Sequence, residues 1–274
     1  MQVALGLLAS VLIGTSDFFG AKSSGRTTAL QTTTVAFLGG AIATAVVSPF
    51  LGTPSARDLG FGALSGVAAF AALTTLWFGY ARSSVGVAAP IAAVVSTVLP
   101  VLWGSIGGDR PGVLGWSGVA VGVVALVLTS YAPGSRNLRD GVVLGGLAGV
   151  WFASMFLLAV NTAEEAGTWP VVSQRATAFV LAALVGMATG TRPIARDLVA
   201  VRWAAIAGAF GACGVAAIVF GGQRGPIAPV IVAGSMYPAV VVGLAWAFLD
   251  ERLRTRQVVG IVAALVGVAL MSLD

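Results

Sequence analysis

Long apolar segments separated by short polar loops dominate this sequence. A helix needs about 20 mainly apolar residues to cross a bilayer, and ten stretches of the chain meet that requirement. They lie near residues 3–21, 29–51, 59–80, 86–107, 112–131, 141–160, 169–189, 200–221, 227–249 and 256–273. Because nearly all charged residues fall between these stretches, we expect an all-α membrane protein with ten transmembrane helices.

The composition supports the same conclusion. Hydrophobic residues make up 58% of the 274 residues and charged residues only 9%, whereas average soluble proteins carry about 25% charged residues. A soluble fold of this size would lack the charges to cover its surface, but a surface that faces lipid needs none. We therefore expect a multi-pass integral protein of the plasma (inner) membrane, with the lipid bilayer as a partner.

Composition also argues against several partners and cofactors. The net charge of +5 is spread along the chain without a basic patch interleaved with aromatic residues, so we expect no nucleic-acid partner. The sequence has no histidine, no carboxylate pair within an apolar segment and no glycine-rich nucleotide-binding loop. We therefore expect no cofactor, no metal site and no enzyme activity.

The second half of the chain repeats the first. At an offset of 142 residues, identical residues recur and Asp109 meets Glu251 as acid for acid. The identical pairs are Phe78/Phe220, Gly79/Gly221, Arg82/Arg224, Arg110/Arg252, Gly118/Gly260, Leu128/Leu270 and Ser130/Ser272. The first segment of each half also matches, at an offset of 139, where Leu5 to Ala9 answers Leu144 to Ala148.

This repeat predicts an inverted topology. Each half has five segments, an odd number, so the second half must enter the membrane from the opposite side. We expect two five-helix repeats, over residues 1–131 and 141–274, joined by a linker loop at 132–140. Secondary transporters commonly use this plan, with the substrate site near the membrane midplane between the repeats.

The distribution of basic residues predicts an orientation. Ten crossings place both termini on one side, and eleven Lys and Arg residues fall on the other side, against three on the terminal side. Cytoplasmic loops carry an excess of Lys and Arg. The count therefore favours extracytoplasmic termini.

Asp17 is the only acid well inside an apolar segment. A carboxylate in hydrocarbon is costly unless it is protonated, paired or facing water. One interpretation is a proton-coupling or cation-binding site. The other is an acid near its helix end that reaches interfacial water or pairs with a base such as Lys22.

Arg175 is the only base inside an apolar segment. A helix rises about 1.5 Å per residue, which separates Arg175 from Asp17 by on the order of 13 Å in depth. We therefore expect no direct salt bridge between them unless the helices tilt or a substrate lies between. One interpretation is that Arg175 contacts an anionic group of the substrate. The other is a structural role, in which its side chain can snorkel toward Glu164 or Glu165.

Further polar and aromatic side chains are candidates to line a midplane site. Small hydroxylated residues often only help helices pack, and aromatic residues often lie at membrane interfaces, so a structural role fits them as well. The candidates are Thr15, Ser16, Trp151, Ser154, Gln174, Ser235 and Tyr237.

Several motifs resemble those of the EamA-type permeases of the drug/metabolite transporter superfamily. They are Gly14 to Phe18 in the first segment, Tyr237-Pro238 in the ninth, and Leu249 to Leu253 before Val258 to Gly260. Arg175 fits an arginine that the family commonly carries early in the second helix of each unit. The first half departs from this pattern, because Gln31 to Thr34 stand there instead.

The resemblance covers essentially the whole chain and implies a transporter. Family members are mostly exporters or exchangers of small metabolites or drugs, usually drawn with cytoplasmic termini, in contrast to the charge count here. We expect a secondary active transporter of a small metabolite or drug-like solute, working by alternating access as a monomer or homodimer, with Asp17 as the candidate for proton coupling. The alternative is a non-transporting membrane assembly or lipid-handling protein.

Overall fold

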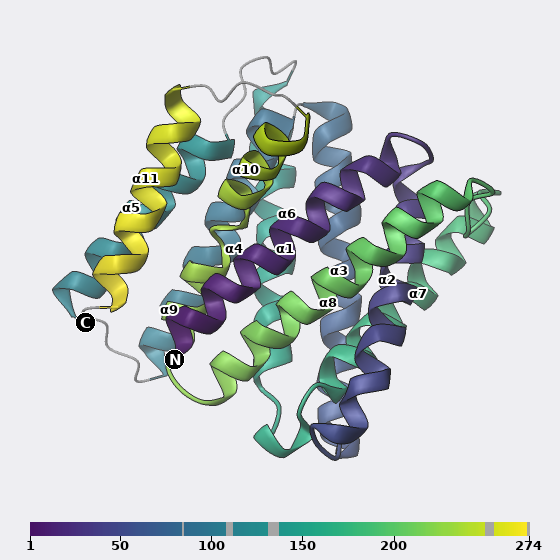
Figure 1. The fold of residues 1–274 in the computed structure, drawn as a ribbon, viewed down its shortest axis with the longest axis horizontal. Helices are drawn as coiled ribbons and strands as arrows, with labels where there is room; N and C mark the ends of the chain where they lie inside the picture. Colours follow the sequence, from purple (N-terminus) through teal and green to yellow (C-terminus); the bar gives the residue numbers. More distant parts are fainter. Residues whose placement is uncertain (84, 108–111, 131–136, 250–254, 273–274) are drawn as a thin grey trace.

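The computed structural model describes the chain except for residues 84, 108–111, 131–136, 250–254 and 273–274 (Figure 1). Its described regular elements are all helical. They are α1 (Gln2–Ser24), α2 (Ala29–Val47), η1 (Ser48–Phe50), α3 (Ala56–Arg82), α4 (Val85–Ile106), α5 (Val113–Ser130), α6 (Leu138–Val160), η2 (Glu164–Ala166), α7 (Trp169–Ala188), α8 (Leu198–Gln223), α9 (Ile227–Gly234), α10 (Tyr237–Leu249) and α11 (Thr255–Ser272).

The helices show that this is a multi-pass membrane protein. In the described part of the chain, α1, α2, α3, α6, α7 and α8 are long and apolar enough to cross a membrane. The loop residues Asp109 and Arg110, the run Asp250 to Arg252, and residues 132–136 of the expected linker lie outside the described residues. Leu138 to Asp140, also expected in the linker, already belong to α6.

One expected segment is broken into two helices. Residues 227–249 form α9 and α10, which are separated by Ser235 and Met236. Proline has no backbone N–H and therefore cannot continue the hydrogen-bond pattern of a preceding helix, but it is well tolerated in the first turn of a new one. Pro238 occupies that place in α10, which is compatible with the break, although α4 continues through Pro100 as a single helix.

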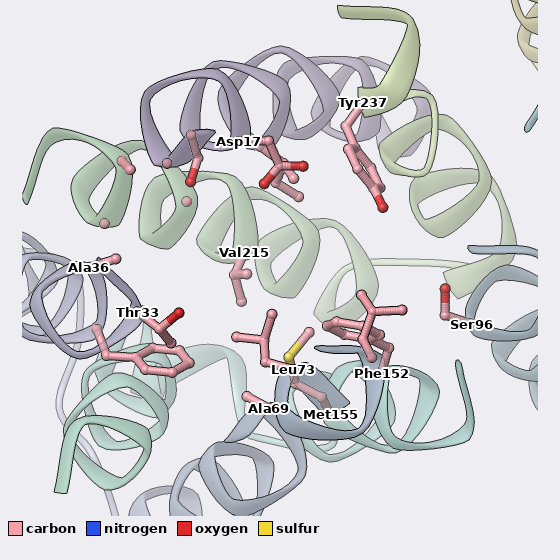
Figure 2. Close-up of a pocket in the computed structure, with 18 of the residues that line it drawn as sticks. Asp17, Thr33, Ala36, Ala69, Leu73, Ser96, Phe152, Met155, Val215 and Tyr237 are labelled. Atoms are coloured by element: carbon pink, nitrogen blue, oxygen red, sulfur yellow. The ribbon is translucent and has the colours of Figure 1, made fainter. Parts of the chain in front are cut away.

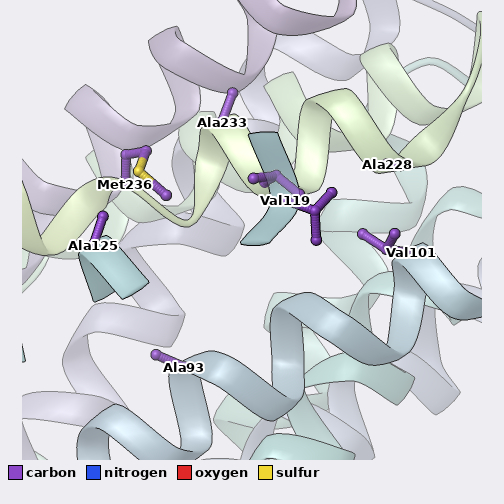
Figure 3. Packing of buried hydrophobic residues seen from close by; sticks show 8 residues of the cluster. Ala93, Val101, Val119, Ala125, Ala228, Ala233 and Met236 are labelled. Carbon is purple, nitrogen blue, oxygen red and sulfur yellow. The ribbon is translucent and has the colours of Figure 1, made fainter. Parts of the chain in front are cut away.

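Eight positions in the bundle form a closed ring. Following the contacts, α1 packs on α8, α8 on α2, α2 on α7, α7 on α3, α3 on α6, α6 on α4, and α4 on α9, which returns to α1 together with α10. The remaining helices, α5 and α11, pack chiefly on each other at one edge of the molecule (Figure 1). Side chains of α4, α5 and α9 join this edge to the ring in an apolar cluster that includes Val101, Val119 and Val232 (Figure 3).

Glycine allows two of the closest helix crossings. A Cβ on Gly6 of α1 would fall 2.6 Å from the Val230 carbonyl oxygen of α9, and one on Gly145 of α6 would fall 2.7 Å from the Ala88 carbonyl oxygen of α4. Small residues let helix backbones approach this closely in membranes. The two crossings therefore fix α9 against α1 and α4 against α6.

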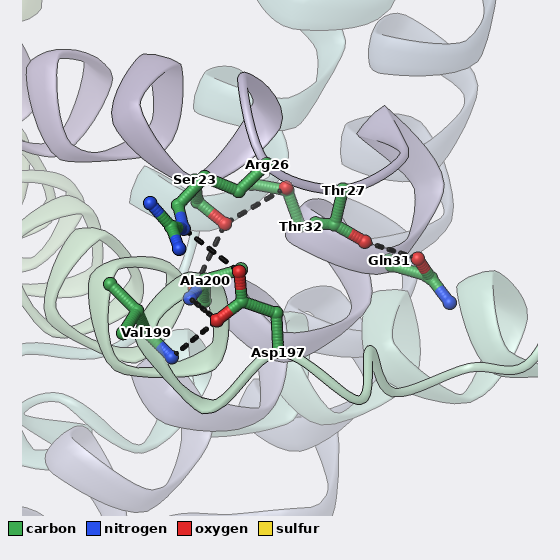
Figure 4. Close-up of polar contacts among 8 residues, drawn as sticks. All are labelled: Ser23, Arg26, Thr27, Gln31, Thr32, Asp197, Val199 and Ala200. Atoms are coloured by element: carbon green, nitrogen blue, oxygen red, sulfur yellow. Dashed lines mark hydrogen bonds and ion pairs between the residues drawn. The ribbon is translucent and has the colours of Figure 1, made fainter.

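The two ends of the bundle are held by different contacts. At the terminal end, where α1 begins and α8 finishes, Arg224 Nε lies 2.8 Å from Glu164 Oε1, and Gln223 Nε2 donates to Thr162 Oγ1 at 2.8 Å. At the far end, where residues 25–28 and 189–197 lie, Arg26 Nε lies 2.8 Å from Asp197 Oδ2 (Figure 4). The terminal end joins α8 to the loop after α6, whereas the far end joins the loop after α1 to the start of α8.

Candidate functional site

A cavity of about 640 Å³ lies within the ring of helices. Its described lining residues come from every helix of the ring and include none from α5 or α11. Ligand sites are usually concave spaces of roughly 300–1,000 Å³ with apolar walls and a few polar groups. The cavity has the size and the lining of such a site.

The cavity extends toward the far end and stops short of the terminal end. Toward the far end its wall includes Ser24, the last residue of α1, and Thr32 in the first turns of α2. Toward the terminal end the wall includes Ile13, Ile218 and Ile231, which belong to an apolar cluster of α1, α8 and α9. That cluster fills the bundle between the cavity and the terminal end. The cavity therefore extends toward only one of the two ends of the bundle.

Polar and apolar side chains occupy different parts of the wall. Figure 2 shows Asp17 and Tyr237 on one side, from α1 and α10, and Leu73 and Met155 on the opposite side, from α3 and α6. Phe152 adds an aromatic ring beside Met155. A ligand in the cavity therefore meets a carboxylate and a phenol across from an apolar surface.

Asp17 presents its carboxylate to the cavity. The residue is solvent-exposed although it lies inside a membrane-crossing helix, and no described residue forms a hydrogen bond or ion pair with it. Lys22, which the sequence suggested as a partner, instead places its Nζ 4.7 Å from the Phe18 ring centroid and 5.4 Å from that of Trp203. The carboxylate of Asp17 is thus available to a ligand or a proton.

Arg175 reaches the same cavity from α7. Its Nη2 donates to the Gly211 carbonyl oxygen of α8 at 2.9 Å, and its guanidinium lies 5.7 Å from the Phe37 ring centroid. Its Nε is buried and has no hydrogen-bond partner among the described residues. The ion pair of Glu164 is with Arg224, and the described contacts include none between Arg175 and Glu165.

Gly211 brings α1 close to this arginine. A Cβ at Gly211 would lie 2.8 Å from Ser16 Oγ and 3.9 Å from Arg175 Nη2. Ser16 and Arg175 therefore flank the same backbone position of α8. Asp17 follows Ser16 directly, so the cavity contains one acid and one base from neighbouring regions of its wall, without an ion pair between them in the described structure.

The structure brings together five of the nine candidates. Asp17, Ser16, Arg175, Ser235 and Tyr237 line the cavity. Ser235 lies at the break between α9 and α10, and its Oγ accepts from Thr97 Oγ1 of α4 at 2.8 Å. The break therefore places a polar contact on the cavity wall.

The other four candidates lie elsewhere. Thr15 and Ser154 donate their hydroxyls to backbone oxygens of their own helices, those of Val11 and Val150. Trp151 is partly exposed at 38% and is not part of the described cavity wall. Gln174 is fully buried, and its Nε2 donates to Ser65 Oγ at 2.6 Å.

Several lining residues carry no polar signal in the sequence. Ala69, Leu73 and Leu76 of α3 line the cavity at the helical spacing of one face, which is also the pattern of an ordinary packing face. Thr33 differs from these three, because it is a polar residue near the start of an apolar segment. The polar run Gln31 to Thr34 was the signal that could have identified it.

Comparison with known protein families gives one match. The model of the EamA-like transporter family matches residues 139–273, which include α6 to α11. The chain belongs to this EamA-like transporter family. The family is part of the drug/metabolite transporter superfamily, and its members are transporters rather than enzymes.

A solved structure shares the fold of this EamA-like chain. A crystal structure superimposes with a TM-score of 0.78 and covers 99% of this chain and 98% of the other, at 15% sequence identity. At that identity the likeness shows the fold alone. No curated protein matches the sequence.

Proposed function

We propose that this protein is a secondary active transporter that exports or exchanges a small metabolite or drug-like solute by alternating access. The observation that carries the proposal is the cavity of about 640 Å³ inside the helix ring, lined by Asp17 and Arg175, reaching one end of the bundle and stopping short of the other. A site that faces one end of a bundle at a time is what alternating access requires.

The pairing of helices supports two inverted five-helix repeats. The contact of α1 with α8 has its counterpart in the contact of α6 with α3, and that of α4 with α6 has its counterpart in that of α9 and α10 with α1. The glycine crossings agree in detail. Gly6 and Gly145 differ by the offset of 139, and their contacts Val230 and Ala88 differ by the offset of 142.

This arrangement assigns helices to two halves of a transporter. The first repeat is residues 1–131 and the second residues 141–274, with α9 and α10 together taking the place that α4 has in the first repeat. Rocking of one repeat against the other would open the terminal end and close the far end.

The orientation follows from the basic residues. The ten segments expected from the sequence assign eleven of the Lys and Arg residues to the side away from the termini and three to the terminal side. Under the positive-inside rule the far end is cytoplasmic and both termini are extracytoplasmic. The cavity then faces the cytoplasm in this structure, which suits the loading of a solute for export.

Asp17 is the candidate for proton coupling. An ionisable residue inside a membrane helix marks an ion or substrate pathway by default, and this carboxylate faces the cavity. The other charged or titratable groups near it are Arg175 and Tyr237 on the cavity wall and Lys22 on the same helix. A proton and a cationic solute group would compete for the carboxylate, which is the requirement for exchange.

The test is solute release from cells that express the protein. Metabolites released by cells with wild-type protein are compared with those from cells with Asp17→Asn at matched membrane levels, and Gly146→Ala serves as control because nothing lies within 4 Å of a Cβ there. We expect a compound that wild type and control release and the Asp17→Asn variant does not. Equal release by Asp17→Asn would remove Asp17 from the mechanism.

The transport proposal has its own test. Release of no compound beyond that of cells lacking the protein, together with no solute exchange in proteoliposomes at any imposed pH gradient, would contradict a transport function. Exchange that is insensitive to the pH gradient would leave transport in place and contradict proton coupling.

A further inference from the structure

We propose that the far end of the bundle carries a binding site for an anionic membrane phospholipid, between the start of α2 and the loop that joins α7 to α8. Arg192 and Arg196 bind the phosphate, and Ile194 contacts the first part of the acyl chains. The site is separate from the central cavity, and the proposal does not depend on the transport function proposed above.

The site is a second pocket, of about 480 Å³. Its described lining comes from α2 and from the loop between α7 and α8, and consists of Gln31, Arg192, Ile194 and Arg196. None of these residues belongs to the wall of the central cavity, whereas Thr32 and Thr33, the next two residues of α2, do line that cavity. A ligand in the pocket therefore does not compete with a solute in the cavity.

The pocket lies at the depth of the lipid headgroups. Of the helices that can cross a membrane, α2 begins at Ala29, α7 ends at Ala188 and α8 begins at Leu198. Each lining residue is within four residues of one of these helix ends. Polar headgroups flank the hydrocarbon core of a bilayer at the level where spanning helices end. A phospholipid can therefore place its phosphate in the pocket while its chains stay beside the helices.

Two guanidinium groups in the pocket are available to an anion. Arg192 and Arg196 are exposed, and neither forms an ion pair with a described residue. The adjacent acid, Asp197, is already engaged, because Arg26 Nε donates to its Oδ2 at 2.8 Å and the Val199 N–H to its Oδ1 at 2.8 Å (Figure 4). A guanidinium presents a planar fork of N–H donors that matches phosphate oxygens. The pocket thus has the charge and the donors for a phosphate.

Hydrogen bonds hold the loop against α2 and α7. Gln31 Nε2 donates to the Arg192 carbonyl oxygen at 3.0 Å, and the Thr191 N–H donates to the Gly186 carbonyl oxygen of α7 at 2.8 Å. The Thr27 hydroxyl donates to Gln31 Oε1 and so fixes the amide that holds the loop (Figure 4). These contacts use the loop backbone and leave the arginine side chains free. Because the backbone is already fixed, binding requires little further ordering.

Apolar surface at the pocket favours a lipid over a soluble anion. Ile194 lies between the two arginines in sequence, lines the pocket and is exposed, as is Leu198 at the start of α8. The last turns of α7 also expose Leu184 and Met187. Inorganic phosphate gains nothing from such surface, whereas covering it with acyl methylenes is favourable. Basic pockets between membrane helices bind anionic lipid headgroups in this way.

The experiment measures lipid binding to the purified protein in a neutral detergent. Native mass spectrometry gives the fraction of protein that carries a lipid during titration with phosphatidylglycerol, or with phosphatidylcholine of the same acyl chains. Both lipids have a phosphate, but the choline cation of the second is repelled by the two arginines. We expect phosphatidylglycerol to bind about fivefold more tightly, which is the effect of one charge at such a surface.

Three variants locate the site. Arg192→Gln and Arg196→Gln each remove one guanidinium and should weaken phosphatidylglycerol binding about tenfold, since each removes a hydrogen bond between charged groups. The matched control is Arg202→Gln, which removes the same charge at the same end. Arg202 is exposed in the second turn of α8, lies outside the described pocket wall and forms no ion pair with a described residue. This control should leave binding unchanged.

The melting temperature of each variant without added lipid shows whether it folds. Arg192→Lys and Arg196→Lys keep the positive charge but lose the planar fork of donors. They should bind phosphatidylglycerol with an affinity between that of wild type and that of the glutamine variants. If a glutamine variant does not fold, the lysine variant at the same position carries the test.

Three results would overturn the proposal. Equal binding of the two lipids would show that the protein does not recognise the headgroup charge. An equal loss of binding in Arg202→Gln would indicate a general attraction of anionic lipid to this end of the bundle. Inorganic phosphate or glycerophosphoglycerol, the headgroup without acyl chains, binding as tightly as the lipid would indicate a site for a soluble anion. Each of these results would leave the transport proposal standing, because the pocket and the central cavity share no described lining residue.

Discussion

Gln174 of α7 donates its side-chain Nε2 to the hydroxyl of Ser65 in α3 at 2.6 Å, and both residues are fully buried. The hydroxyl in turn donates to the Met155 carbonyl oxygen of α6 at 2.7 Å. This chain of two bonds links α7 and α3 to α6 at Met155, which lines the cavity. It gives Gln174 a structural role next to Arg175, which faces the cavity from the following position.

We expect Ser65→Ala to destabilise the protein by about 1 kcal/mol, because the Gln174 amide is then left without its partner. The double variant Ser65→Ala/Gln174→Met should recover part of this loss, since both polar partners are replaced by apolar groups. Thermal melting in detergent measures both effects. A double variant less stable than Ser65→Ala alone would show that Gln174 has another partner.

Two adjacent glycines in α6, Gly145 and Gly146, allow a test of helix packing with a matched control. A Cβ at Gly145 would meet the Ala88 backbone of α4, whereas one at Gly146 has nothing within 4 Å. Gly145→Ala should therefore cost about 1–3 kcal/mol through overpacking, and Gly146→Ala should be neutral or slightly stabilising because alanine favours helix. Equal melting temperatures for the two variants would contradict the close crossing of α4 and α6.

The far end should respond to acid through Asp197. Its Oδ1 accepts from the Val199 N–H at 2.8 Å, and the hydrogen bond from Arg26 to Oδ2 lowers the pKa of this carboxyl below its usual value (Figure 4). A lowered folded-state pKa gives stability that is present above the unfolded value of about 3.9 and is lost as the pH falls through the folded value.

The corresponding measurement is melting temperature against pH. Wild type should lose stability below about pH 4 more steeply than Asp197→Asn, which keeps the cap but has no charge to lose. At neutral pH Asp197→Ala should melt lower than Asp197→Asn, because it also loses the cap. Parallel pH curves for wild type and Asp197→Asn would show that the contact with Arg26 adds nothing.

The closed terminal end should open more often when its ion pair is removed. Arg224 and Glu164 are 30% and 54% exposed in their side chains, so their pair is worth at most about 1 kcal/mol. That energy changes a two-state equilibrium by up to roughly fivefold. We therefore expect Glu164→Gln to raise the reactivity of an Ile13→Cys probe toward a water-soluble maleimide added from the terminal side, by a factor of a few.

The probe is placed in a Cys213→Ala background, since Cys213 is exposed. Arg57→Gln is the control, because Arg57 lies at the same end over the Phe61 ring, at 5.4 Å, and forms no ion pair among the described residues. A labelling rate unchanged by Glu164→Gln, or raised equally by Arg57→Gln, would contradict a role for the pair in closure.

Helix positions were largely predictable because apolar length is a local property. Each expected segment contains described helix, although residues 227–249 form two helices, the second of which begins just before Pro238. The linker expected at 132–140 ends earlier in the structure, because α6 already begins at Leu138. Asn137 caps this helix by accepting a hydrogen bond from the Asp140 N–H. Polar residues next to an apolar run are ambiguous in sequence, because a cap and a loop use the same residue types.

Charge was the clearest sequence signal for residues of the cavity wall. Asp17 and Arg175 stand out against an apolar background and both line the cavity. Thr15 and Ser16 are adjacent and chemically alike, yet only Ser16 lines the cavity, while Thr15 bonds to its own helix. Gln174 and Arg175 differ in the same way, because successive residues of a helix point about 100° apart and only packing decides which of them faces the cavity.

The sequence by itself determined that this chain is a helical membrane protein, because twenty apolar residues can satisfy their backbone groups in lipid only as a helix. It also showed the internal repeat and the two charged residues that lie within apolar segments. The tertiary structure decided which end of the bundle is closed and which residues share a wall. Those facts depend on contacts between segments far apart in the chain, such as Gly211 beside both Ser16 and Arg175, and no local pattern encodes such contacts.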